Sequence, residues 1–189
     1  MAMNLALFGK NVSEPVIPFV QELFDQLHLL NGRVMVYKPY FQGLCGKIGF
    51  QRIPEQYSTQ QEIEGKVDFL LSIGGDGTIL DAVGVVGDSG IPVAGINLGR
   101  LGFLSGIPRE QIVQALQALG QGDFKLEKRT LLQLDAPDNL FGTNRFALND
   151  LTVYKPDVMS MLTIRTWIND VFLNSYWADG LIIATPTGS

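Results

Sequence analysis

Four short apolar runs divide the first half of the chain. Residues 5–8, 34–37, 68–73 and 92–96 each predict a β-strand, because they are short, apolar and followed by polar or glycine-rich segments. The run at 68–73 does not alternate between polar and apolar residues, which is typical of a central parallel strand covered on both faces. The glycine-rich residues 39–49 show no regular pattern, and we interpret them as a candidate mobile loop.

Helical spacing fills the intervals between these runs. Ser13 can cap a helix with two prolines in its first turn, and apolar residues recur down one side of that helix: Val16, Val20, Phe24 and Leu27. A second helix is predicted after Thr78, and a third begins at Pro108. The order of strands and helices predicts an α/β domain over residues 1–124, Rossmann-like and with a mainly parallel sheet.

The pattern changes near Gly122. A long strand is then predicted, with every second residue from 124 to 134 on one face: Phe124, Leu126, Lys128, Thr130, Leu132 and Leu134. Residues 145–153 and 161–168 predict two more strands, and Asn169-Asp170 predicts a hairpin turn after the second. Residues 125–189 are therefore predicted to form a partial all-β domain. We expect the chain to be truncated, because it stops in a turn-like segment after the apolar run 181–184.

Composition and charge exclude several classes of function. Of the 189 residues, 46% are hydrophobic and 17% charged, which argues against a disordered tail or a coiled coil. A net charge of −5 gives no basic footprint for nucleic acid. Cys45 and His28 are the only cysteine and histidine, so a disulfide framework and a thiolate or histidine metal cluster are excluded. With no basic leader and no membrane-spanning run, we expect a cytoplasmic protein without a membrane partner.

Gly74-Gly75-Asp76-Gly77-Thr78 is the segment most informative about chemistry. Its glycines stand between a buried strand and a helix start, where backbone N–H groups can approach phosphate oxygens. It is not a Walker A loop, and it lacks the third glycine of a dinucleotide fingerprint. Asp76 would repel phosphates unless it accepts a proton from an attacking hydroxyl or holds Mg²⁺. Alternatively, the segment is a simple strand-to-helix turn with Asp76 as a local cap.

This segment resembles the motif shared by NAD kinases, diacylglycerol kinases and 6-phosphofructokinases. Three later segments resemble NAD kinases specifically: Asn-Leu-Gly-Arg-Leu-Gly-Phe-Leu at 97–104, Ala-Leu-Asn-Asp at 147–150, and residues 179–189. The four segments follow in the family's order. On these residues the chain is identified as similar to bacterial NAD kinases, without their C-terminal part.

The resemblance implies transfer of the terminal phosphoryl group of ATP, or of inorganic polyphosphate, to the adenosine ribose 2′-hydroxyl of NAD. It implies that Asp76 is the general base, and the lone histidine, far from any motif, also favours a carboxylate in this role. Mg²⁺ or another divalent cation would accompany ATP, with no protein ligand assigned to it. The residues implied to bind the donor phosphates are Gly74, Gly75, Gly77 and Thr78.

The same resemblance implies a set of NAD-binding residues: Asp76, Gly77, Gly102, Phe103, Asn149, Asp150, Asp179 and Thr187. Gly102 and Phe103 would form a pocket wall. Asp150 replaces the glutamate usual in the family and reaches one methylene less far. Strand alternation would point Asn149 and Asp150 to opposite faces, so both reach NAD only at a bulge or a sheet edge.

Asp179 is implied to contact the nicotinamide end of NAD, and Thr187 its adenosine half. A homodimer or homotetramer is implied for the whole molecule. Two alternatives stay open. A lipid or sugar kinase of the same superfamily would share the glycine loop but would not explain residues 179–189. The other alternative is a module that senses NAD or NADP without chemistry. Replacement of Asp76 by asparagine separates the two, because a catalytic base predicts a large loss of turnover with dinucleotide binding largely kept.

Overall fold

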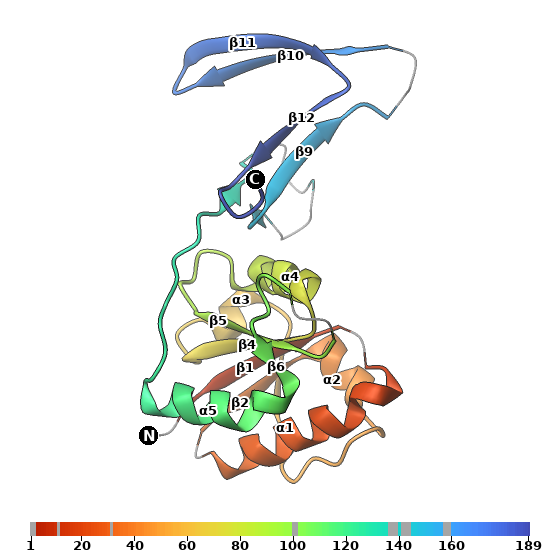
Figure 1. The fold of residues 1–189 in the computed structure, drawn as a ribbon, viewed down its shortest axis with the longest axis vertical. Helices are drawn as coiled ribbons and strands as arrows, with labels where there is room; N and C mark the ends of the chain where they lie inside the picture. The colour runs from red at the N-terminus through yellow and green to blue at the C-terminus, as the bar shows by residue number, and fades with distance from the viewer. Residues whose placement is uncertain are drawn as a thin grey trace. The chain divides into compact units, whose positions relative to one another are not determined.

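The structure is a computed structural model, and it describes residues 3–10, 12–30, 32–99, 102–135, 140, 145–156 and 160–189. The chain forms two compact units (Figure 1). The first unit extends to Glu127, and the second begins at Lys128 and runs to Ser189. Arg145 groups with the first unit. The units divide three residues after the boundary predicted between residues 124 and 125.

A six-stranded sheet forms the centre of the first unit. Its strands are β1 (Leu5–Gly9), β2 (Val34–Tyr37), β3 (Glu55–Tyr57), β4 (Phe69–Ile73), β5 (Val93–Asn97) and β6 (Ile107–Pro108). They lie in the order β3-β2-β1-β4-β5-β6, and every neighbouring pair is parallel. The predicted α/β architecture is confirmed. The strand order reverses between β1 and β4, which is where doubly wound sheets bind ligands, beyond the carboxyl ends of the strands.

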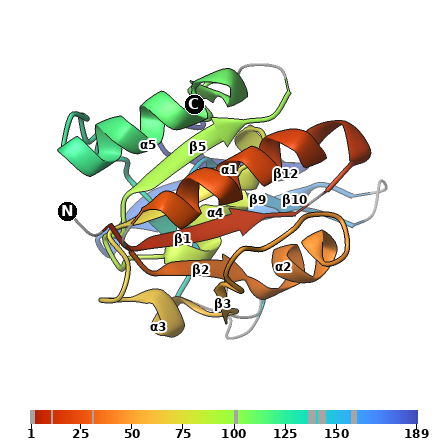
Figure 2. The ribbon, with the colours of Figure 1, turned by 90° about the horizontal axis from the view of Figure 1, so that it is seen from below.

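Helices cover both faces of this sheet (Figures 1 and 2). α1 (Ile17–Leu29) and α5 (Ile112–Gln121) pack on one face, and α3 (Gln60–Ile63) and α4 (Asp76–Val86) on the other. Short 3-10 turns, Glu14–Val16 and Arg109–Gln111, precede α1 and α5. Ser13 precedes the first turn, but its side chain makes no capping hydrogen bond. No helix in the described ranges has the length and apolar character needed to cross a membrane.

The two faces of the sheet divide the core into two clusters. Side chains alternate along β1, so Leu5 and Leu7 join the cluster under α1 and α5, while Ala6 and Phe8 join the cluster under α3 and α4. All four side chains are buried. Each fully buried leucine or phenylalanine contributes about 1.5–3 kcal/mol relative to an exposed one. This double burial explains why the strands read as unbroken apolar runs.

Two sequence predictions about irregular segments are wrong. Residues 39–49 are not simply a loop, because α2 (Lys38–Leu44) occupies their first half and buries Tyr40 and Leu44. Residues 124–134 do not form a long strand, since only β7 (Leu132–Gln133) is regular there. The side chains from 121 to 130 are exposed, and no strand in the described ranges pairs with that segment. Alternation without a pairing partner leaves the backbone groups to water and forms no strand.

The second unit is built from antiparallel pairs of strands. β9 (Asp150–Tyr154) pairs with β12 (Gly180–Ala184), β10 (Leu162–Ile168) with β11 (Val171–Ala178), and β7 with β8 (Phe146–Ala147). The predicted hairpin turn is confirmed, because Asn169 and Asp170 connect β10 and β11 with φ of 50° and 63°. Positive φ at both turn residues matches the twist of the flanking strands.

Candidate functional site

The glycine loop, Gly74-Gly75-Asp76-Gly77-Thr78, leaves the carboxyl end of β4 and begins α4. The Gly74 N–H donates to the Ile96 carbonyl at 2.9 Å, and the Thr78 N–H donates to the Gly75 carbonyl at 2.9 Å. A Cβ at Gly74 would overlap the Thr78 side chain. Glycine is therefore needed at this position for the chain to turn directly from strand to helix.

Several N–H groups of the glycine loop are available to a ligand. No acceptor for the N–H groups of Gly75, Asp76 and Gly77 is found among the described residues. Gly75 and Gly77 are exposed. The first N–H groups of an α-helix have no partner inside the helix, and the helix dipole adds partial positive charge there. This arrangement can bind a phosphate group.

Asp76 turns its carboxylate toward the loop that follows β5. Its Oδ1 accepts hydrogen bonds from the Leu104 N–H at 3.1 Å and from the Ser105 N–H and hydroxyl, both at 2.9 Å. Its Oδ2 accepts from the Phe103 N–H at 2.8 Å. These bonds, led by that of the Ser105 N–H, lower the pKa of Asp76 against the opposing effect of partial burial. Asp76 is thus ionised at neutral pH, and within the described ranges Oδ2 carries the fewer hydrogen bonds.

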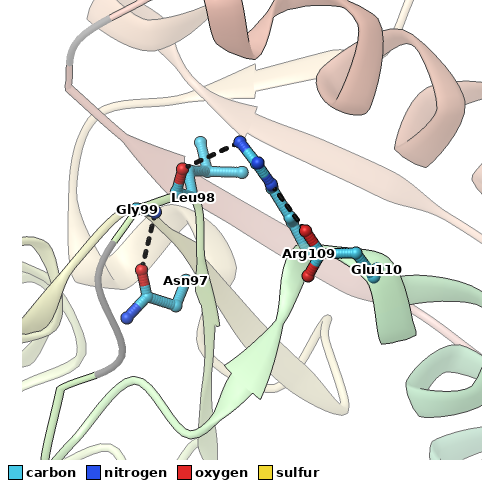
Figure 3. Close-up of polar contacts among 5 residues, drawn as sticks. All are labelled: Asn97, Leu98, Gly99, Arg109 and Glu110. Carbon is cyan, nitrogen blue, oxygen red and sulfur yellow. Dashed lines mark hydrogen bonds and ion pairs between the residues drawn. The ribbon is translucent and has the colours of Figure 1, made fainter.

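The loop after β5 is fixed at its base by side chains on both sides (Figure 3). The Asn97 Oδ1 accepts from the Gly99 N–H at 2.8 Å. The Arg109 Nη1 donates to the Leu98 carbonyl at 3.4 Å, while its Nε pairs with the Glu110 carboxylate at 2.8 Å. The start of the loop is therefore tied both to the end of β5 and to the 3-10 turn before α5.

Ser105 joins this fixed loop to Asp76. The Asn97 Nδ2 donates to the Ser105 Oγ at 3.1 Å, and both residues are buried. The Ser105 hydroxyl is left to donate to Asp76. Sequence reasoning missed Ser105, although it directly follows the recognised segment 97–104. A buried serine after that segment has no pattern of its own, and only the fold brings it to Asp76.

Gly102 and Phe103 lie in the same loop, as the sequence predicted for a shared site. A Cβ at Gly102 would overlap the Asp76 carboxylate, so glycine allows the loop to wrap around that side chain. The Phe103 N–H binds Asp76, but the Phe103 ring is fully exposed. The role of Phe103 as a pocket wall stays a prediction.

In the second unit, the turn after β12 folds against Asn149. The Thr185 N–H donates to the Asn149 carbonyl at 2.8 Å, and the Thr187 N–H donates to the Thr185 Oγ1 at 3.1 Å. A Cβ at Gly188 would overlap the Asn149 backbone. The turn that contains Thr187 therefore lies against the Asn149 backbone. Binding of one ligand by both residues stays a prediction.

Asn149 directly precedes β9, so strand alternation does not set its direction relative to Asp150. The Asn149 Oδ1 is buried and has no hydrogen-bond partner among the described residues. A buried acceptor without a partner is unusual in native proteins. Asp150 is exposed and accepts a hydrogen bond from the Thr152 hydroxyl at 3.1 Å. Because Asn149 stands just outside β9, its side-chain oxygen can be buried while Asp150 is exposed, and no bulge is needed.

Asp179 lies at the other end of the β9–β12 pair. Asp150 pairs with Ala184, whereas Asp179 directly precedes Gly180, at the opposite end of β12. The four residue-to-residue steps from Gly180 to Ala184 separate the two ends by roughly 14 Å. The Asp179 carboxylate pairs with the Lys155 Nζ at 2.6 Å, a partner that sequence reasoning missed. The second unit thus presents two separate places for contact with a long ligand.

No group of three or more His, Cys, Asp and Glu side chains suited to a metal ion occurs in the described ranges. Mg²⁺ is commonly held by one or two carboxylates together with substrate phosphates, rather than by a cage of protein ligands.

Comparison with known proteins gives consistent matches. Residues 13–124 match the family model of the ATP-NAD kinase N-terminal domain. The NAD kinase of Cytophaga hutchinsonii is 41% identical over 191 residues, and that of Flavobacterium psychrophilum is 39% identical over 189. Each match covers 99% of this chain and 64% of the relative. The chain therefore spans 64% of the length of these curated relatives.

Solved structures give the same picture of the fold. A crystal structure of yeast NADH kinase complexed with NADH superposes with a TM-score of 0.78 at 25% identity, covering 99% of this chain and 58% of that one. A NAD kinase from Archaeoglobus fulgidus in complex with ATP gives a TM-score of 0.63 at 24% identity, covering 98% and 62%. The second likeness shows a shared fold.

Proposed function

The chain belongs to the NAD kinase family, and from this membership we propose that the protein transfers the terminal phosphoryl group of ATP, or of inorganic polyphosphate, to the 2′-hydroxyl of the adenosine ribose of NAD. One observation carries the proposal. An ionised carboxylate, Asp76, is held by four hydrogen bonds in the same segment that offers free N–H groups at a helix start. A proton acceptor and a phosphate site are the two parts that this reaction requires.

Asp76 acts on the acceptor alcohol. The ribose oxygen forms a bond to the terminal phosphorus, the bond from that phosphorus to its bridging oxygen breaks, and the hydroxyl proton passes to Asp76. Oδ2 is the better placed oxygen, because Oδ1 already accepts three hydrogen bonds. The lowered pKa makes Asp76 a weak base. A weak base is sufficient for a loose phosphoryl-transfer transition state, which depends mainly on positioning and charge stabilisation.

The glycine loop acts on the donor. The N–H groups of Gly75 and Gly77, at the start of α4, bind phosphate oxygens. The N–H groups of Gly74 and Thr78, which were also predicted to bind phosphate, already donate to the carbonyls of Ile96 and Gly75, so these two residues shape the turn. Mg²⁺ or another divalent cation enters bound to the donor phosphates and neutralises part of their charge.

NAD contacts both ends of the β9–β12 pair. Asn149 and Asp150 bind the dinucleotide, including its ribose hydroxyls. Thr187 binds the adenosine half, and Asp179 binds toward the nicotinamide end. The separation of the two ends, roughly 14 Å, supports separate contacts with the two halves of an extended dinucleotide. The NADH bound in the similar yeast kinase supports a dinucleotide acceptor. On the first unit, Gly102 and Phe103 bind NAD in the loop whose N–H groups hold Asp76. We place this activity in the cytoplasm.

Comparison of phosphate acceptors tests the proposal. The purified protein is incubated with ATP, Mg²⁺ and one of three acceptors: NAD, diacylglycerol or fructose 6-phosphate. NADP formation is followed with an NADP-dependent dehydrogenase, and transfer to lipid or sugar is followed with radiolabelled ATP. We expect label on NAD alone. Label that appears only on the lipid or the sugar would refute the proposal in favour of another kinase of the superfamily.

A further inference from the structure

A cation stands at the same sheet edge as the glycine loop. Lys10 directly follows β1, and β1 pairs in parallel with β4 so that Gly9 lies opposite Ile73. Because Gly74 directly follows Ile73, Lys10 and the glycine loop leave neighbouring strands at the same register. These are the two strands between which the strand order reverses. Lys10 therefore lies at the edge where this class of sheet binds ligands.

An ion pair directs Lys10 toward the start of α4. The Lys10 Nζ pairs with the Asp81 carboxylate. Asp81 lies four residues after Gly77 and three after Thr78, and residues at these spacings share one side of a helix. The ammonium group of Lys10 is consequently held beside the first turns of α4, the helix whose start carries the N–H groups available for phosphate.

Lys10 can readily exchange the Asp81 carboxylate for another anion. The side chains of Lys10 and Asp81 are 51% and 41% exposed. Ion pairs at this exposure contribute little to stability, so the pair opens at small cost. A triphosphate carries several negative charges, so it attracts the lysine ammonium group more strongly than a single carboxylate does. The chain itself has a net charge of −5, so a polyanionic donor requires local positive charge.

We propose that Lys10 binds the terminal phosphates of the phosphoryl donor, exchanging Asp81 for phosphate oxygens when the donor arrives. The inference rests on the proposed function, because it names a cation for the donor side of that reaction. In the transition state of phosphoryl transfer, the ammonium group stabilises charge on the phosphoryl oxygens. Without the donor, Asp81 keeps Lys10 directed toward α4, which reduces the freedom that the side chain loses on binding.

Three variants of the purified protein separate this role from a structural ion pair. Lys10→Met removes the charge at similar length, Lys10→Arg keeps a charge, and Asp81→Asn breaks the same ion pair but keeps the cation. We expect Lys10→Met to raise KM for ATP about 10- to 100-fold, as loss of a charged hydrogen bond does. KM for NAD should stay unchanged. Asp81→Asn should leave KM for ATP equal or lower, and Lys10→Arg should retain most of the ATP affinity.

A structural ion pair predicts a different result. Lys10→Met and Asp81→Asn would then lower the melting temperature alike and leave KM for ATP unchanged, and this outcome overturns the inference. Equal losses of ATP affinity in both variants also overturn it, because only Lys10→Met removes the cation. Circular dichroism and thermal unfolding of all three variants confirm that each folds.

Calorimetric titration with Mg²⁺-ATP separates failure of the inference from failure of the proposed function. If ATP binds and Lys10→Met weakens binding, but NAD is not phosphorylated, the proposed function fails and the Lys10 site stands. If NAD is phosphorylated with the same ATP affinity in wild type and Lys10→Met, the inference alone fails. A wild-type protein that binds no ATP would overturn both.

Discussion

At Asp76, hydrogen bonds lower the pKa of the carboxyl group below its ordinary value, with the Ser105 N–H as the first contributor. The folded state is therefore stabilised by the ionised form. This stabilisation is fully present above the ordinary carboxyl pKa of about 4 and is lost as pH falls through the lowered folded pKa. We expect the difference in unfolding free energy between wild type and Asp76→Asn to be constant near neutral pH. Below about pH 4 the wild-type advantage should shrink.

Urea denaturation of both proteins across that pH range measures the difference. Asp76→Asn has nearly the same shape but does not titrate, so other carboxyl groups cancel in the comparison. A difference that grows as the solution is acidified would mean that the Asp76 carboxyl is not held in its ionised form.

Gly102 gives a second test at the scale of one residue. A Cβ there would overlap the Asp76 carboxylate, whereas a Cβ at Gly99 meets only the Asn97 Oδ1, at 4.0 Å. We expect Gly102→Ala to lower kcat by roughly 10- to 100-fold, because a displacement of the base by about 1 Å is costly in catalysis. The matched control, Gly99→Ala, should keep nearly full activity. Steady-state kinetics of both variants measure the change in kcat. If the two variants lose kcat equally, or if neither loses it, the role given to Gly102 is contradicted.

The sequence pattern identified Asp76 and the glycine loop but not the residues that hydrogen-bond to the predicted site residues. Asp76 and its glycines form a local pattern, so their spacing alone indicates a phosphate site. Ser105 lies 29 residues from Asp76, and Lys155 lies 24 residues from its ion-pair partner Asp179. Such partners have no local signal, because their proximity depends on strand order and register.

At the scale of elements, the β10–β11 hairpin contains backbone strain that can be relieved. Asp170 has a φ of 63°, a region that costs a side chain about 1 kcal/mol and costs glycine little. We expect Asp170→Gly to stabilise the protein by about 0.5–1 kcal/mol, since Asn-Gly is the favoured pair in this turn. Urea unfolding measures the change. Asp170→Ala serves as control and should destabilise; a loss of stability in Asp170→Gly would contradict the turn geometry.

The elements that sequence mispredicted show what patterns omit. Residues 38–44 contain a proline and a glycine, yet the proline falls in the first helical turn, where its missing N–H costs nothing. Burial of Tyr40 and Leu44 then stabilises α2 through tertiary contacts. Residues 124–130 alternate as a strand does, but a strand also needs a partner, and the sequence pattern does not show one.

For the whole molecule, self-association into a homo-oligomer can be measured directly in solution. Large apolar side chains of β10 and β11 are exposed: Trp167, Phe172 and Trp177. Exposed apolar groups of this size favour association. We expect a homodimer or homotetramer of the purified protein, one that is insensitive to salt because apolar contacts are not screened. Light scattering that gives a monomer mass would refute this prediction.

The strand order β3-β2-β1-β4-β5-β6 is likewise a property of the whole first unit. The sequence predicted four of these strands and their parallel arrangement. β3 and β6 are too short to give a pattern, with three and two residues. The reversal between β1 and β4 could be read only from the structure, and it places Lys10 beside the glycine loop.

Turnover of Asp76→Asn is the most direct test of whether Asp76 takes the hydroxyl proton. We expect this variant to lower kcat for NADP formation by about 10²- to 10⁴-fold, the range for loss of a general base. Its affinity for NAD, measured by calorimetry, should remain near that of wild type, because asparagine keeps the shape of the side chain. A variant that forms NADP at a rate close to wild type would show that Asp76 does not take the proton.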